Sequence, residues 1–307
     1  MRVEKDSVRV GIHSAPNHAD DILCVALVKR FHKDVEVIRT RDEEVLKTCD
    51  YVLDVGGVNE KIEIDKDGCI TRIICDHHAK DSGYEENGVK KAACSKLVDI
   101  LYSDNDFVRE ELHSILIDPV AVSDNGQDLN VGTNFLNFVG IIAEPDWTDA
   151  TADSEESFNE ALTMTEKVLA KVLENITNKQ YGMSLVGKAF NTEKGYIILE
   201  QYVPRSIWQQ YLFLNDKEQK VFCVIFPTTH DTWDAVMAHK KKGSFECITT
   251  FPEKWCGKRD KELEEASGIK DAIFCHSAGF FWESKTKESA IKAVENSIYE
   301  LFKEFFG

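Results

Sequence analysis

The chain has 307 residues, of which 43% are hydrophobic and 30% charged, and its formal net charge is −17. This length fits two domains, and the negative field disfavours non-specific binding to duplex nucleic acid without forbidding a local basic groove. Its nine cysteines include no Cys-x-x-Cys pair, which argues against a structural zinc site and a secreted disulfide framework. With no signal peptide and no apolar run near the ~18 residues of a membrane span, we expect a cytoplasmic protein without membrane contact.

The first motif lies in a loop after an apolar strand expected at residues 8–12. This loop contains His13, His18 and Asp20, and the helical spacing of the apolar residues at 21–30 predicts that Asp20 caps a helix. Sites in open α/β sheets lie at the carboxyl ends of strands. Taken alone, solvated loop histidines and a capping aspartate are the simpler interpretation.

Three later apolar segments also end in metal-ligating residue types. One ends at Asp54, the next at the Asp-His-His triplet of residues 76–78, and the third at Asp124. Strands alternating with helices predict an α/β fold with a parallel, doubly wound sheet. Such a sheet would bring the four segments to one edge, and their four histidines favour a metal site.

Mixed imidazole and carboxylate ligands suit Mn²⁺, Co²⁺ or Zn²⁺ better than Mg²⁺. The set is too large for one four-coordinate ion, so we expect two divalent ions about 3.5–4 Å apart, with Asp54 as the bridge. The expected ligands are His13, His18 and Asp54 for one ion, and Asp20, Asp54, His77 and Asp124 for the other.

A pair of such ions can lower the pKa of a water, which then attacks phosphorus, and can stabilise the leaving oxygen. His77, His78 and Asp76 form the expected catalytic set. His78 would orient the substrate or protonate the leaving group, and Asp76 would hold an imidazole tautomer. No Gly-x-Ser-x-Gly, Walker or Gly-x-Gly-x-x-Gly motif offers a competing chemistry.

The chain divides into three predicted regions. Residues 1–150 form the catalytic domain, 151–182 an amphipathic helical connector that ends at 178–182, and 183–307 a smaller α/β substrate-binding domain. In the last region we expect strands at 195–199, 221–226, 246–249 and 271–276, and helices at 262–266 and 289–305. The lysine run 240–242 is expected to be a solvated turn, with phosphate binding as the less favoured alternative.

An ordered set of motifs spans nearly the whole chain. In the first half these are Gly11-Ile-His-Ser, His18-x-Asp20, Arg39-Thr-Arg-Asp42, Asp54-Val-Gly-Gly57, Asp76-His-His and Asp124-Asn-Gly126. In the second half they are Trp255-x-Gly257-x-Arg259-Asp260, Ser267-Gly-Ile269 and Ile273-Phe-x-His276-Ser-x-Gly279-Phe280. This set resembles the DHH phosphoesterase superfamily, and most closely the melanocyte-proliferating-gene (MYG) family within it.

The resemblance implies a dinuclear Mn²⁺-type site in an N-terminal α/β domain, closed by a C-terminal domain that binds substrate. It implies a 3′-to-5′ exonuclease acting on RNA or short oligonucleotides. By resemblance His276, Ser277 and Gly279 face the substrate, and Arg259 is a phosphate clamp because guanidinium binds phosphate bidentately.

Several positions depart from the family pattern. Asn17 and Asp21 stand where an aromatic residue and Glu are usual, and Ala121 replaces an acid of the fourth motif. Asp118 lies nearby and could substitute, so the fourth-motif ligand is either Asp118 or Asp124.

The second half leaves further alternatives open. Phe281 and Trp282 stand where glycines are usual, and Trp255 and Phe280 could either stack a base or belong to the core. A small-molecule phosphohydrolase acting on pyrophosphate or a dinucleotide, and a metal-binding regulatory protein without catalysis, remain alternatives. Whether the chain forms homo-oligomers is also left open.

Overall fold

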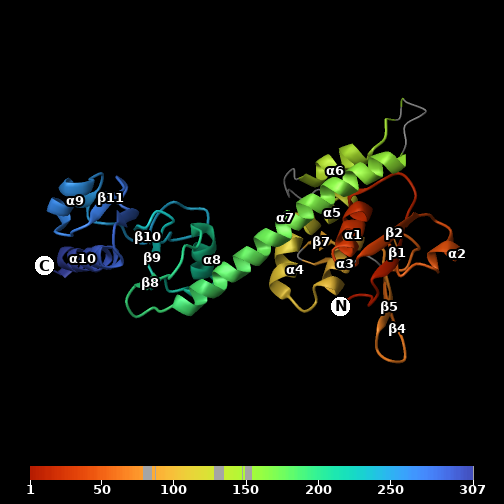
Figure 1. Cartoon of the computed structure of the whole chain (residues 1–307), viewed down its shortest axis with the longest axis horizontal. Coiled ribbons are helices and arrows are strands. Elements are labelled where there is room, and N and C mark those ends of the chain that lie inside the picture. Colours follow the sequence, from red (N-terminus) through yellow and green to blue (C-terminus); the bar gives the residue numbers. More distant parts are fainter. Residues whose placement is uncertain (79–84, 87, 128–134, 147, 149–153, 307) are drawn as a thin grey trace. The chain divides into compact units, whose positions relative to one another are not determined.

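The computed structural model describes residues 1–78, 85–86, 88–127, 135–146, 148 and 154–306 (Figure 1). The chain divides into two compact units, residues 1–177 and 178–307. Each unit contains a five-stranded sheet with helices packed on it. The predicted α/β class is therefore confirmed.

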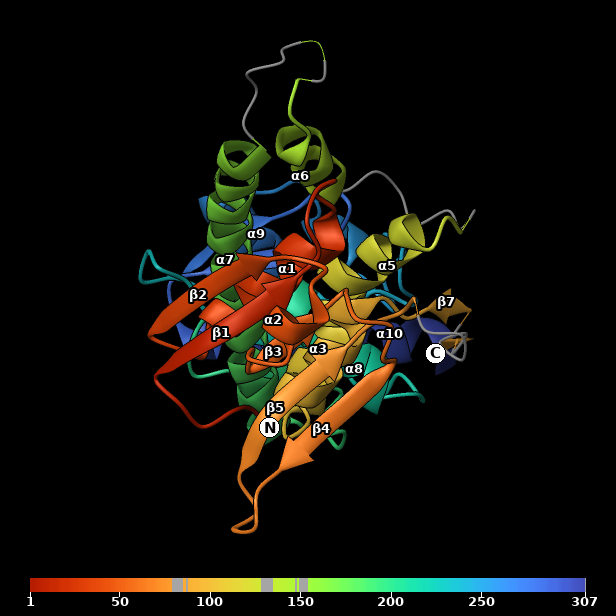
Figure 2. The same cartoon turned by 90° about the vertical axis from the view of Figure 1, so that its right-hand side faces the viewer.

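Unit 1 is built on a mostly parallel sheet of order β2-β1-β3-β5-β4 (Figure 2). The strands β2, β1, β3 and β5 are mutually parallel, as predicted. The edge strand β4 pairs antiparallel with β5 and was not expected. The strands are β1 (Ser7–Ile12), β2 (Asp34–Arg39), β3 (Tyr51–Leu53), β4 (Glu60–Ile64) and β5 (Ile70–Cys75). A separate two-stranded ribbon pairs β6 (Glu85–Glu86) with β7 (Val89–Lys90).

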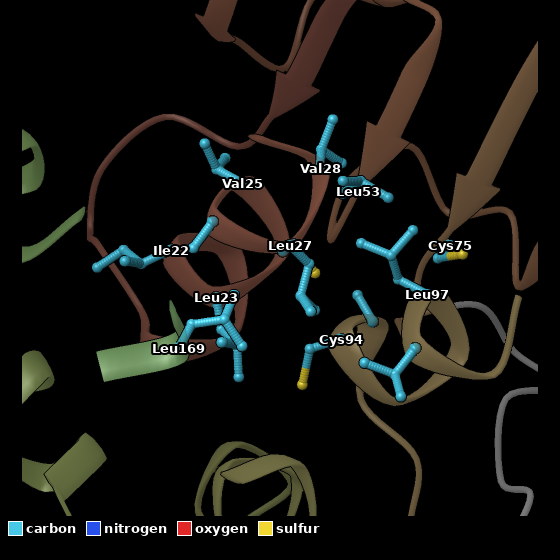
Figure 3. Packing of buried hydrophobic residues seen from close by; sticks show 14 of the residues in the cluster. Ile22, Leu23, Val25, Leu27, Val28, Leu53, Cys75, Cys94, Leu97 and Leu169 are labelled. Atoms are coloured by element: carbon cyan, nitrogen blue, oxygen red, sulfur yellow. The ribbon is translucent and has the colours of Figure 1, made fainter. Parts of the chain in front are cut away.

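Helix α1 (Ala19–Lys29) lies at the centre of the core of unit 1. Residues 22–28 are all buried, because the helix is apolar on every side and packs between the sheet and α3 (Ala93–Leu101). Figure 3 shows Leu27 of α1 pointing toward Cys94 of α3, with Leu53 and Cys75 of the sheet nearby. The other helices of unit 1 are α2 (Glu43–Leu46), α4 (Asp106–Leu112), a π-helix (His113–Ile117), α5 (Asp118–Asp124) and α6 (Phe135–Ala143).

Helix α7 (Ser154–Ala189) has 36 residues and continues from unit 1 into unit 2. The prediction that it ends at 178–182 was wrong. Gly182 lies inside the helix, and a Cβ there would come within 3.0 Å of Ile207 on α8 (Arg205–Asn215). This glycine therefore permits close packing between two helices instead of ending one.

Unit 2 contains a mixed sheet of order β11-β12-β10-β9-β8, parallel only between β8 and β9. Its strands are β8 (Tyr196–Ile198), β9 (Cys223–Pro227), β10 (Trp233–Met237), β11 (Ala272–Cys275) and β12 (Phe281–Ser284). The prediction of a strand at 246–249 was wrong, since only an isolated bridge between His239 and Cys247 forms there. Helices α9 (Asp260–Ser267) and α10 (Lys287–Phe306) and a 3-10 turn (Glu253–Trp255) complete the unit.

Charge is distributed unequally between the two units. Residues 1–177 carry 19 basic and 36 acidic side chains, whereas residues 178–307 carry 18 of each. The whole net charge of −17 therefore belongs to unit 1. Among the described helices, none is both long and apolar enough to cross a bilayer.

We predict that stability of unit 2 falls as the pH rises from about 4 to about 7. Burial, and then repulsion by Glu283 on β12, raises the pKa of Asp234 on β10 to about 7. The folded state thus holds a proton that the unfolded state releases above about pH 4. Asp234→Asn should remove this dependence and gain about 1–2 kcal/mol at pH 8 relative to wild type.

Urea unfolding followed by tryptophan fluorescence measures this effect, because four of the five tryptophans lie in residues 178–307. The exposed Glu265→Gln on α9 is the control. Equal gains for Asp234→Asn at pH 4 and pH 8 would contradict the prediction.

Candidate metal centre

The carboxyl ends of three parallel strands bring the predicted ligands together. His13 follows β1, Asp54 follows β3, and His77 lies just past β5. Asp54 Oδ2 is 3.2 Å from His13 Nε2, and Asp54 Oδ1 is 3.2 Å from His77 Nε2. Asp124 comes from the last residue of α5, not from a strand, and its Oδ2 lies 2.8 Å from His77 Nε2.

Within the described residues, the His and Asp side chains form three overlapping groups, each with ligand atoms within 4.8 Å of one another. The groups are His13, His18 and Asp54; Asp54, His77 and His78; and Asp20, His77 and Asp124. The first group is the set expected for one ion. Asp54 belongs to the first two groups, which is the position required of a bridging carboxylate, and His77 belongs to the last two. The third group holds three of the four residues expected for the second ion, without Asp54.

The polar atoms at the centre of this cluster fit a divalent cation. His13 Nε2, both carboxylate oxygens of Asp54 and Asp124 Oδ2 are buried, and despite the short distances within the cluster none of them makes a hydrogen bond of acceptable geometry in the described part of the chain. Buried polar atoms without partners are costly and rare in folded proteins. Imidazole nitrogen and carboxylate oxygen are the ligands that Mn²⁺ and related ions accept, so a bound cation would satisfy all four atoms.

Asp54 is held in an unusual backbone conformation at the centre of the cluster. Its φ is 55°, and its backbone N–H donates to Cys75 O at 2.8 Å. A non-glycine residue in this region is uncommon and is typical of functional sites. Burial opposes ionisation of the Asp54 carboxyl, but His13 and His77 outweigh burial and hold its pKa below the usual range.

Asp20 does not cap α1, so that prediction was wrong. Helix α1 begins at Ala19, and the Asp20 carboxylate instead accepts hydrogen bonds from the backbone N–H groups of Ala93 (2.9 Å) and Cys94 (2.8 Å) at the start of α3. Burial, followed by repulsion from Asp54 and other carboxylates, raises the pKa of Asp20 to about 7. A cation beside Asp20 would relieve this crowding of negative charge.

Asp21 is a residue of the site that the sequence interpretation did not assign. Its Oδ1 accepts from the backbone N–H of His18 at 3.0 Å, and its Oδ2 lies 3.5 Å from His13 Nε2. The three-residue spacing from His18 is that of a capping box and could have indicated this role. Asn17, the other departure in this loop, donates to the backbone carbonyl of Ala143 at 2.7 Å and lies outside the three groups.

The contacts of Asp76 differ from the role expected for it. Its carboxylate oxygens accept from the backbone N–H groups of Gly57 (2.6 Å) and His78 (2.8 Å). Asp76 therefore fixes two loops and makes no bond to an imidazole that the described contacts show, whereas Asn125 Oδ1 lies 3.3 Å from His77 Nδ1 and helps to orient that ring. The His78 side chain is 61% exposed, with Nε2 3.5 Å from Asp54 Oδ1.

Asp118 lies away from the cluster, at the start of α5. It accepts from His113 Nδ1 at 2.8 Å, while His113 Nε2 lies 3.0 Å from Asp99 Oδ1. Burial opposes the charged imidazole, but the two carboxylates outweigh it and raise the pKa of His113 to about 9. These residues line a separate pocket of about 370 Å³, which leaves Asp124 as the fourth-motif residue beside the centre.

The residues expected to bind substrate in unit 2 lie around the turn after β11. His276 is half-buried, Ser277 is exposed, and Gly279 is buried with a φ of 68°. His276 Nδ1 accepts from the Ala278 N–H at 3.0 Å. Arg259 is exposed, and its Cζ lies 4.7 Å from the centre of a neighbouring aromatic ring, that of Phe274.

The aromatic candidates separate into core and surface. Trp255 is 1% exposed and packs against Phe251 and Trp282, so it belongs to the core and cannot stack a base. Phe280 is half-buried, and its ring centre lies 4.4 Å from that of His276. Of the two candidates, only Phe280 reaches the surface.

The fold and the cluster define an α/β protein with a His–Asp site suited to divalent cations. The MYG1 exonuclease family model, described as "Uncharacterised protein family (UPF0160)", matches residues 9–98 and 84–298. The chain belongs to this family, as its motifs predicted.

Relatives are similar over almost the whole chain. The human MYG1 exonuclease is 24% identical, covering 94% of this chain and 85% of that protein. A Chlamydia pneumoniae MYG1 protein is 27% identical, covering 95% and 97%. Among solved structures, the pGpG-specific phosphodiesterase PggH of Vibrio cholerae (TM-score 0.32, 10% identity, 97% and 99% covered) and exonuclease RecJ bound to manganese (TM-score 0.28, 10%, 95% and 90%) are distant matches.

Proposed function

We propose that this chain is a metal-dependent phosphodiesterase, specifically a 3′-to-5′ exonuclease that uses two divalent cations, Mn²⁺ by preference, on RNA or short oligonucleotides. The observation that carries the proposal is the sharing of Asp54 between two ligand groups. The similarity to a human protein named MYG1 exonuclease supports the nuclease activity. Residues 1–150 would be the catalytic region, α7 (Ser154–Ala189) the connector and the residues after it the substrate-binding region.

The residues of the chain have distinct roles in this proposal. When bound, the paired cations would supply positive charge that acidifies a water and stabilises the leaving oxygen. The three overlapping groups of His and Asp side chains would hold them. His78, exposed beside Asp54, would orient the substrate or protonate the leaving oxygen, while Asp76 fixes its backbone. His276, Ser277, Gly279 and Arg259 would contact the substrate.

The matched substitutions Asp124→Asn and Asp118→Asn test the proposal directly. Both acids lie on α5, but only Asp124 lies within the cluster. We expect Asp124→Asn to reduce Mn²⁺-dependent release of mononucleotides from a 3′-labelled oligoribonucleotide by at least about 100-fold, because even outer partners of metal ligands contribute about 10–100-fold. Asp118→Asn should retain release within a few-fold of wild type.

Other outcomes identify the alternatives. Mn²⁺-dependent hydrolysis of pyrophosphate or a dinucleotide, with none on longer strands, would indicate a small-molecule phosphohydrolase. Mn²⁺ binding that is lost in His77→Ala, without turnover of any phosphoester, would indicate a regulatory protein. Either result would reject the exonuclease.

A further inference from the structure

Residues 239–247 of unit 2 form an ordered loop, the 239–247 loop, whose first and last residues make an antiparallel bridge. Lys240 N–H donates to Glu246 O at 2.8 Å, and the two side chains form an ion pair. Lys241 and Lys242 are exposed, and neither makes an ion pair with any side chain in the described ranges. The loop thus carries three lysines against one glutamate, and the side chains of Lys241 and Lys242 are open to solvent.

The same loop presents Phe245, which is 93% exposed and the most exposed large apolar side chain described. Its ring meets that of His239 edge-on, with centres 6.0 Å apart and planes at 81°. The ring is therefore positioned by its neighbour while its surface faces solvent. The apolar face of this ring is therefore open to a ligand that can stack on it.

Arg205 connects this loop to the turn that carries His276. Its Cζ lies 5.5 Å from the Phe280 ring centre, and its NH2 donates to Met237 O at 2.7 Å. On the other side, burial and then the charge of Arg205 lower the pKa of His239. We name the surface formed by Phe280, Arg205, Phe245, Lys241 and Lys242 the aromatic–basic strip.

The strip has the alternation of rings and cations that single-stranded nucleic acid requires. Bases of a single strand are free to stack on aromatic side chains, while its phosphates need cations at intervals. Unit 2 carries no net charge, unlike unit 1, so a polyanion meets no general repulsion there. An isolated ring flanked by lysines offers too little apolar area for a protein partner.

We propose that the aromatic–basic strip binds single-stranded nucleic acid, with bases on Phe280 and Phe245 and phosphates at Arg205, Lys241 and Lys242. The inference rests on the proposed function and narrows its substrate to strands several nucleotides long, in place of dinucleotides. The lysine run that the sequence predicted as a solvated turn is then a phosphate contact on a turn.

Binding can be measured apart from hydrolysis, with EDTA in place of Mn²⁺. Fluorescence anisotropy of the full chain with a 5′-labelled dinucleotide and a 12-nucleotide oligoribonucleotide gives the two affinities. We expect Phe245→Ala to weaken 12-mer binding about tenfold and to leave dinucleotide binding unchanged. The double variant K241Q/K242Q should reduce the slope of log K against log salt by about 1.4.

The double variant K270Q/K285Q, at two exposed lysines outside the strip, is the matched control and should leave 12-mer affinity unchanged. Equal 12-mer affinity in wild type and Phe245→Ala would reject nucleic-acid binding by the strip. A loss of 12-mer affinity in K270Q/K285Q as large as that in K241Q/K242Q would also reject it. Tighter binding of the 12-mer than of the dinucleotide, without Mn²⁺-dependent hydrolysis, would reject the exonuclease function but support nucleic-acid binding by the strip. Equal hydrolysis of short and long strands, unaffected by either strip variant, would support the exonuclease function but reject binding by the strip.

Discussion

On the proposed function, replacing Asp54 by Asn should abolish phosphodiester hydrolysis and the binding of a pair of cations. Asp54 is shared by two ligand groups, and no other acid among the described residues lies within 3.2 Å of both His13 and His77. Asn keeps the size of the side chain but has one neutral oxygen in place of two charged ones. Because outer partners of metal ligands alone contribute about 10–100-fold, we expect a fall in kcat of at least about 10³-fold.

Two measurements separate this effect from unfolding. Calorimetric titration with Mn²⁺ should show two sites in wild type and at most one in Asp54→Asn, while the far-ultraviolet circular dichroism stays the same. Asp118→Asn, outside the cluster, should bind as wild type does. Two tight Mn²⁺ sites in Asp54→Asn would show that the bridging role is wrong.

Gly279→Ala should destabilise unit 2 by about 3 kcal/mol. Two costs add there. A residue with φ near 68° is strained by about 1 kcal/mol or more when it carries a Cβ. That Cβ would also lie 3.0 Å from Thr250 Cβ and 3.1 Å from Phe251 O, and such overpacking costs about 1–3 kcal/mol.

Gly257→Ala is the matched control for this position. Gly257 has a φ of 77°, but no described atom lies within 4 Å of the Cβ position. Gly257→Ala should therefore lower the free energy of unfolding only by the cost of backbone strain, about 1 kcal/mol. Urea unfolding followed by the fluorescence of the buried Trp255 and Trp282 gives both values, and equal losses in the two variants would contradict the packing argument.

The strand ends of unit 1 were predictable because local sequence marks them. His13, Asp54 and His77 each directly follow or nearly follow an apolar run, and parallel strands bring such ends to one edge. The grouping of His13 and His18 with Asp54 also matches what was expected. The four parallel strands of unit 1 follow from the same alternation, whereas the antiparallel edge strand β4 does not.

Other features depend on contacts between distant residues and leave no local signal. Asp20 precedes an apolar helix in the way a cap does, but its partners lie more than 70 residues further along the chain. Strand β10 reads Trp-Asp-Ala-Val-Met, and its strand state is set by pairing with β9 and β12 on its two sides. Gly182 resembles a helix end in the sequence, because the close approach of Ile207 on α8 that requires a glycine there cannot be seen without the structure.

Asp20 couples the stability of the first turn of α3 to cation binding at the proposed metal centre. The carboxylate that anchors the first two amides of that helix is also within reach of a cation shared with His77 and Asp124. A cation that displaced the Asp20 carboxylate would weaken its hydrogen bonds to the Ala93 and Cys94 amides. Fraying at the start of α3 would likewise displace the carboxylate and weaken cation binding. On the proposed function, a substitution of Asp20 should therefore lower both the thermal stability of unit 1 and its affinity for the cation.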